Sequence, residues 1–207
     1  MPNCSWSFTI ARALVVMLVS ATSIVAEPVD RPSVRVRVND YASVAVDLLA
    51  RAQDEVKQLY ARIGVETTWL ATRRLSDHDD LSHSEDANAT ELTVIVLSSS
   101  MTTRMAPPED AIGMAATTPT DNGRIAYVFY DRLQIDPLQS DDSNVAALAF
   151  VMAHEIGHLL LPYGSHSETG VMRGRWDRKT FRRLEVQRLR FTPLQGRQIR
   201  HLLDFAW

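Results

Sequence analysis

The feature that most constrains this chain is a pair of histidines, His154 and His158, within a strongly apolar stretch. The apolar run before them, from Val145 to Met152, predicts a helix that is buried on almost all sides. Residues four positions apart on a helix project from the same face one turn apart, so both imidazoles can reach one ion. We therefore expect a largely buried helix that presents two histidines to a metal.

Glu155 follows the first histidine, where it can take a proton from a water on the metal without being a ligand itself. This is the H-E-x-x-H pattern of zinc hydrolases, in which the metal lowers the pKa of its water to about 7. A catalytic zinc usually takes three protein ligands, so a third must come from elsewhere. His166 is the most economical candidate, because Pro162 ends the helix and Gly164 allows the chain to turn back.

Met172 lies beyond His166 at the end of a Gly-Val-Met sequence. The whole stretch resembles the metzincin zinc peptidases, whose pattern is H-E-x-x-H-x-x-G-x-x-H followed by a methionine turn. His-Ser followed by Gly-Val-Met is most similar to the matrixin branch of that family. The resemblance implies one catalytic zinc on His154, His158 and His166, with Glu155 as general base and Met172 as the floor beneath the zinc. A plain core methionine is the alternative interpretation of Met172.

The spacing departs from the family pattern in one respect. Two extra residues separate the second and third histidines, and Leu161 occupies the position of the family's glycine. If the helix runs further before it turns, His166 still ligates the metal; otherwise Glu168 or a water takes the third position. The altered spacing also supports a rival hypothesis, a secreted zinc-containing binding protein without peptidase activity. A protein without a metal, in which the motif arose by chance, is a third hypothesis.

The rest of the chain predicts an α+β fold. Alternating or continuously apolar runs rich in β-branched residues indicate strands, and a helical apolar period indicates a second long helix. The resemblance implies a mixed, twisted metzincin-like sheet of about five strands with an active-site helix, a second long helix and a C-terminal helix. The expected strands are 33–38, 65–70, 92–97, 112–118 and 125–130, and the second long helix is expected at 43–63.

Several local expectations accompany this assignment. The strands at 33–38 and 65–70 flank the long helix and should pair in parallel. The strand at 92–97 is almost continuously apolar, as expected of a central strand covered on both faces. We expect a loop over 98–110, and Thr192-Pro193 is typical of the start of a last helix that runs to the end of the chain.

Gly113, Met114 and Ala115 lie in the expected strand 112–118. In metzincins the corresponding strand is antiparallel and forms the edge above the cleft. The resemblance therefore implies that these three residues pair with an extended polypeptide substrate. An ordinary connector that contains a glycine is the alternative interpretation.

The first 26 residues are typical of a secretory signal peptide. Arg12 precedes an apolar run that is short for a membrane span, and Ala26 supplies the small residue for cleavage. An uncleaved membrane anchor is the alternative. The chain then divides into a signal peptide, 1–26, and a metzincin-like catalytic domain, 27–207, with an upper subdomain, 33–164, and a lower C-terminal subdomain, 165–207.

The remaining features suggest no further site. Cys4 is the only cysteine and lies in the signal peptide, so the mature chain has no disulfide and no thiol to keep a zinc latent. The chain from Arg173 onward is basic, but no nucleic-acid motif accompanies it and a solvated helix face is expected. His78 and His83 lie in an acidic stretch, 76–90, where an exposed loop is favoured over a secondary cation site.

Taken together, these patterns predict a secreted or periplasmic zinc-dependent metalloendopeptidase. Zinc would be its one cofactor, polypeptides its substrates and Glu155 the general base that acts on a metal-activated water. We expect a monomer that binds no nucleic acid and has no stable membrane association once the signal is cleaved.

Overall fold

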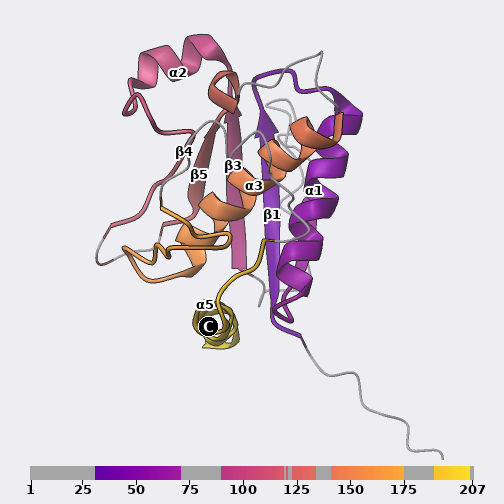
Figure 1. Ribbon diagram of the computed structural model, residues 1–207, viewed down its shortest axis with the longest axis vertical. Coiled ribbons are helices and arrows are strands. Elements are labelled where there is room, and N and C mark those ends of the chain that lie inside the picture. The colour runs from indigo at the N-terminus through magenta and orange to yellow at the C-terminus, as the bar shows by residue number, and fades with distance from the viewer. Residues whose placement is uncertain are drawn as a thin grey trace, which may run out of the picture. The chain divides into compact units, whose positions relative to one another are not determined.

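A mixed five-stranded sheet forms the framework of the protein in this computed structural model (Figure 1). The structure describes residues 31–70, 90–118, 120, 123–133, 141–174 and 189–205, all within one compact unit that begins at Arg31. The strand order is β2-β1-β3-β5-β4, and every neighbouring pair is parallel except β4 with β5. The strands are β1 (Ser33–Asp40), β2 (Glu66–Leu70), β3 (Thr90–Leu97), β4 (Gly113–Ala115) and β5 (Ile125–Phe129).

Two long helices pack against each other over one face of this sheet (Figure 1). They are α1, which follows β1, and α3, which carries the two closely spaced histidines. A C-terminal helix, α5, contacts α3, and a short helix, α2, follows β3. The helices are α1 (Val46–Ala61), α2 (Ser99–Met105), α3 (Asp141–Leu160) and α5 (Pro193–Phe205), with a 3-10 turn, η1 (Tyr130–Leu133), after β5.

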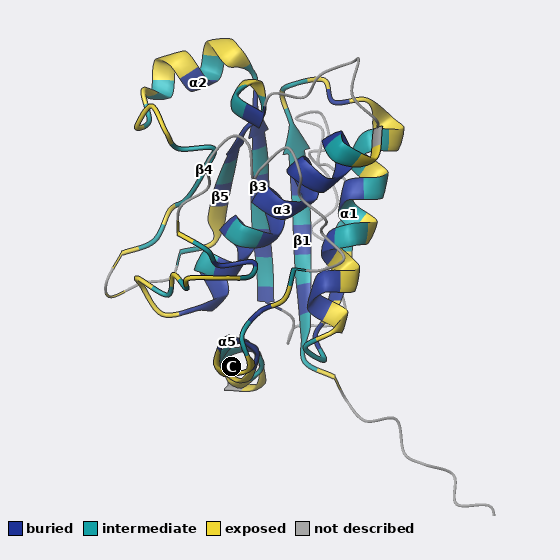
Figure 2. Ribbon diagram, in the orientation of Figure 1, coloured by how far each residue is buried: buried dark blue, intermediate teal, exposed yellow. Residues whose placement is uncertain are grey.

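Burial alternates along the strands, so the helix-covered face of the sheet forms the core (Figure 2). Val36 lies opposite Leu92 in the β1–β3 register, and both are buried. The other face is half-buried in the part of the chain that the structure describes, and there Arg37 donates a hydrogen bond to Glu91 over 2.9 Å. β3 is central as predicted, but it shows alternating burial where the sequence predicted cover on both faces.

The α+β class, the strands and the parallel β1–β2 pair confirm the predictions from the sequence, with boundaries that shift by a few residues. The second long helix begins at Val46 because the chain first makes a tight turn. In this turn the Asp40 carboxylate accepts hydrogen bonds from the backbone N–H groups of Ala42 and Val44, each over 2.8 Å. Ser43 lies between them with φ 55°, a backbone conformation that a helix cannot contain.

The prediction of a loop over 98–110 is wrong in its first half, where the chain forms α2. The Thr102 hydroxyl donates to the carbonyl of Ser98 over 3.1 Å, and Ala106 ends the helix in a left-handed conformation directly before Pro107. A helix of seven residues is too short to show an apolar period in the sequence. The apolar pattern therefore gave no indication of this element.

Helix α3 is the buried helix that the sequence predicted. Every residue from Val145 to Ala153 is buried. The part Asp142–Leu160 is long and apolar enough to cross a membrane, but 83% of an 18-residue window within it is buried inside the domain. The hydroxyl of Tyr60 on α1 donates to the carbonyl of Ala153 over 3.0 Å and so ties the two helices together one residue before His154.

Some of the predicted features lie outside the described residues. These are the signal peptide with Cys4, the acidic stretch that contains His78 and His83, and the basic stretch at 175–188. The last helix is described as far as Phe205 and begins at Pro193, as the sequence indicated.

Tyr60→Phe should lower the free energy of unfolding by about 1 kcal/mol, because it removes a buried hydrogen bond between α1 and α3 and little else. Urea denaturation of the two proteins measures this difference. Tyr41→Phe is the matched control, since Tyr41 is 54% exposed and should tolerate the change. Equal unfolding midpoints for Tyr60→Phe and the wild type would show that the hydroxyl does not stabilise the helix pair.

Candidate metal centre

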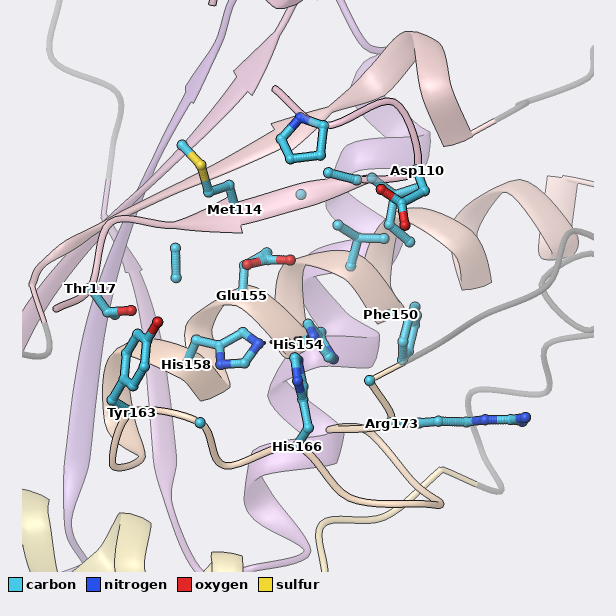
Figure 3. A pocket seen from close by; sticks show the side chains of 18 residues that line it. Asp110, Met114, Thr117, Phe150, His154, Glu155, His158, Tyr163, His166 and Arg173 are labelled. Carbon is cyan, nitrogen blue, oxygen red and sulfur yellow. Dashed lines mark hydrogen bonds between the residues drawn. The ribbon is translucent and has the colours of Figure 1, made fainter. Parts of the chain in front are cut away.

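Three imidazoles converge at the floor of a cleft between α3 and the edge strand β4 (Figure 3). His154 and His158 lie one turn apart on α3, and His166 comes from the bend that follows the helix. One ring nitrogen from each lies within 4.8 Å of the other two, and the ring centroids are 4.7 to 5.5 Å apart. Among the described residues, this is the group that could hold a metal ion.

The two extra residues lie in the bend and not in a longer helix. α3 ends at Leu160, and the chain turns after Pro162 with Gly164 in a left-handed conformation at φ 79°. This path returns His166 to the other two histidines in spite of the extra residues. Glu168, the alternative third ligand, is exposed and is not part of the group.

The protonated nitrogen of His154 can be assigned from its partner. Its Nδ1 lies 2.7 Å from the carbonyl oxygen of Val171, which can only accept, so Nδ1 donates and Nε2 is left for a metal. The Nε2 atoms of His154 and His158 are 3.1 Å apart. Two nitrogens that bind one tetrahedral zinc at about 2.0–2.1 Å lie roughly 3.3 Å from each other. The spacing of this pair therefore fits zinc.

Met172 lies fully buried against the backbone of α3. A Cβ added to Gly157 would be 2.4 Å from its Sδ, so only a glycine lets the thioether approach this closely. The turn that carries Met172 also supplies the Val171 carbonyl that orients His154, and the backbone N–H of Ser167 donates to the Met172 carbonyl over 2.8 Å. One turn thus supports the helix, one histidine and the segment that follows His166.

Glu155 is 5% exposed, and its carboxyl group faces β4 (Figure 3). A Cβ added to Gly113 would lie 2.6 Å from Oε1, so the glycine makes the space that the carboxyl occupies. Burial raises the pKa of Glu155 to about 8, and a hydrogen bond from the backbone of Ala115 acts in the opposite direction. The sequence indicated Gly113 only as part of an edge strand and contained no signal for this contact.

The two helix histidines are uncharged at neutral pH. Burial lowers the pKa of His154 to about 4, with the hydrogen bond to Val171 opposing the shift. Burial, together with the nearby rings of His154 and His166, lowers the pKa of His158 to about 3. Neutral imidazole is the form that binds a metal, and a set of three imidazoles is typical of zinc. The donor atoms present therefore fit a zinc ion.

The cleft above the imidazoles has a volume of about 510 Å³ and follows β4. Asp110 and Phe150 line one end, and Thr117 and Tyr163 line the other (Figure 3). Ala116 donates its backbone N–H to β5, and backbone groups alternate in direction along an antiparallel strand. The N–H of the neighbouring Ala115 consequently faces the cleft, as its hydrogen bond to Glu155 shows, and the Ala115 carbonyl accepts the backbone N–H of Thr117 over 3.0 Å.

This fold occurs in a protein of known structure. No protein-family model and no curated protein sequence matches the chain. Its structure is similar to that of archaemetzincin from Methanopyrus kandleri, with a TM-score of 0.54 and 14% identity over 84% of this chain and 97% of that one. The protein thus has the metzincin-like fold that the sequence resemblance implied.

Glu155→Gln should change how the stability of the metal-free protein depends on pH. The folded-state pKa of Glu155 is about 8, so between pH 4.5 and pH 8 the unfolded chain ionises this carboxyl and the folded chain does not. Stability is therefore lost as the pH rises through this window. Glutamine does not ionise, so it removes this pH dependence. Its side-chain oxygen can still accept the backbone hydrogen bond from Ala115.

Chemical denaturation in the presence of a chelator, at pH 5 and pH 7, measures this difference. The gain in stability from Glu155→Gln should be larger at pH 7 than at pH 5 by on the order of 2 kcal/mol. The same gain at both pH values would show that the pKa of Glu155 is not raised.

Proposed function

We propose that this protein is an exported, zinc-dependent endopeptidase that cleaves polypeptides bound along β4. The observation that carries the proposal is the convergence of His154, His158 and His166 next to the buried carboxyl of Glu155. The open cleft beside an edge strand provides the place for an extended chain.

The three histidines would hold the zinc through ring nitrogens, with His154 held in orientation by the Val171 carbonyl. A bound zinc supplies a Lewis acid and lowers the pKa of water to about 7. Its positive charge also favours the ionised form of a carboxyl group nearby. Glu155 would then accept a proton at its carboxylate as water attacks the peptide carbonyl, and would pass that proton to the leaving amine.

The substrate would add to the sheet as a further strand along Gly113, Met114 and Ala115. These residues form the outer edge of the sheet. β4 is antiparallel to β5, as the resemblance to the metzincins implied. Strand addition reads the backbone of a peptide more than its side chains, which suits a polypeptide substrate. The edge strand therefore supports an endopeptidase rather than an enzyme for small molecules.

Several finer features belong to the same proposal. The Gly-Val-Met sequence that ends at Met172 supports a matrixin-like enzyme, and the apolar N-terminal stretch supports export to the periplasm or the exterior through a signal peptide at 1–26. The catalytic domain would comprise 27–207, with its lower subdomain from residue 165. We propose a monomer that binds neither nucleic acid nor membranes.

The rival is a secreted zinc-containing binding protein without peptidase activity. Its main support was the longer spacing between His158 and His166. That spacing does not separate the two rings, whose centroids are 4.7 Å apart. The peptidase is therefore the better supported of the two.

The decisive test combines metal analysis with Glu155→Ala. Both the wild type and the variant should bind about one zinc per chain, because Glu155 is not a ligand. Cleavage of casein or a peptide library should fall at least about 100-fold in the variant, which loses its general base. Zinc without cleavage by the wild type would favour the binding protein, and a wild type without zinc would overturn both hypotheses.

Gly113→Ala tests the position of the general base. The new Cβ would overlap Oε1 and Cγ of Glu155, so the carboxyl must move away from β4. We expect kcat to fall about tenfold or more with zinc content unchanged, since small displacements of a catalytic group cost this much. Full activity with zinc retained would show that Glu155 does not need its place beside β4.

A further inference from the structure

The bend that carries His166 is the most exposed part of the metal centre. Pro162, Tyr163, Gly164 and His166 are all exposed. A ligand on an exposed bend loses conformational freedom when it binds a metal, unless other contacts already hold it. The contacts of this bend therefore bear on how tightly the site binds zinc.

One of these contacts comes from α5, thirty residues further along the chain. The side-chain Nε2 of Gln195 donates to the carbonyl of Ser165 over 3.2 Å. Ser165 directly precedes His166, so this bond holds the peptide unit that leads into the third imidazole. Gln195 is only 6% exposed, so little water can replace the bond.

The two ends of the Gln195 amide have different partners. Its Oε1 accepts the backbone N–H of Thr192 over 3.0 Å, and the backbone N–H of Gln195 donates to the Thr192 hydroxyl over 3.2 Å. This reciprocal pair is a capping box at the start of α5. Because the Thr192 N–H can only donate and the Ser165 carbonyl can only accept, the orientation of the amide is defined.

Helix α5 is itself held against the domain. Arg200 donates to the carbonyl of Ile63, two residues after α1, over 2.7 Å. Ile199 is fully buried, and the ring of Phe191, just before the helix, lies 5.0 Å from the ring of Tyr60. The helix can therefore act as a fixed support for the bend.

We propose that Gln195 is a positioning residue for the zinc site, acting through His166. By holding the Ser165 carbonyl it keeps the bend in the conformation that brings His166 to His154 and His158. The two extra residues of this bend make such a support more necessary, because a longer segment has more conformations to lose. This inference rests on the proposed zinc site.

Three variants separate this role from helix capping. Gln195→Glu keeps an oxygen for the Thr192 N–H but loses the amide donor, and Gln195→Met removes the donor without adding a charge. Thr192→Val removes the hydroxyl of the capping box and leaves the bond from Gln195 to Ser165 in place. Zinc affinity is measured by competition with a chelator of known affinity, and stability by thermal unfolding of the metal-free proteins.

Both Gln195 variants should bind zinc about tenfold more weakly than the wild type. Thr192→Val should unfold at a lower temperature but keep the affinity of the wild type. In cobalt-loaded samples, the visible spectra of the Gln195 variants should shift towards that of His166→Ala, because the third ligand is less fully engaged. In a His166→Ala background, the Gln195 substitutions should have no further effect on affinity.

The outcomes distinguish this inference from the proposed function. A wild type that binds no zinc overturns the metal site itself. A wild type that binds zinc, with equal affinity in both Gln195 variants, overturns the positioning role and leaves the metal site standing. A loss of affinity that persists undiminished in the His166→Ala background also overturns it, because Gln195 would then act through another part of the protein.

Discussion

The metal centre depends on burying two imidazoles and a carboxyl group together without a compensating charge. Burial lowers the pKa values of His154 and His158 and raises that of Glu155, so at neutral pH these three groups are mostly uncharged in the metal-free protein. The Nε2 atoms of His154 and His158 lie 3.1 Å apart, so in the metal-free protein one proton on His158 serves both nitrogens through a hydrogen bond. A divalent cation would satisfy both nitrogens and favour the carboxylate, so the arrangement suits a cation better than it suits an empty core.

The surrounding fold holds these groups in place through contacts that come from different parts of the chain. Tyr60 ties α1 to α3 at the residue before His154, and the carbonyl of Val171 sets the orientation of that ring. Two glycines allow the closest approaches, Gly157 for the methionine under the helix and Gly113 for the carboxyl beside β4. Rigid packing of α3 in the core is what makes such precise contacts possible, because a buried helix cannot shift to relieve a clash.

The sequence predicted those parts of the site that depend on local periodicity. Four-residue spacing placed His154 and His158 on one helix face, and alternation identified β1 and β3. Contacts between distant segments produce no such periodicity in the sequence. Thr192-Pro193 indicated where α5 begins, but the hydrogen-bond partner of the Gln195 side-chain N–H lies thirty residues away. The space made by Gly113 depends on β4 lying over α3, which no property of the strand itself reveals.

The long bend shows why motif spacing is an indirect guide to ligand geometry. Leu161, the residue after α3, is fully buried, and the extra length is absorbed beyond it by exposed residues around Gly164. An added Cβ at Gly164 would have no other atom within 4 Å. The end point of the bend is held independently. Ser167 bonds to the carbonyl of Met172, and the backbone of Gly174 packs against the His166 ring so closely that an added Cβ would lie 3.0 Å from it. Where both ends of a segment are held by tertiary contacts, its length can vary while the ligand that it delivers stays in position.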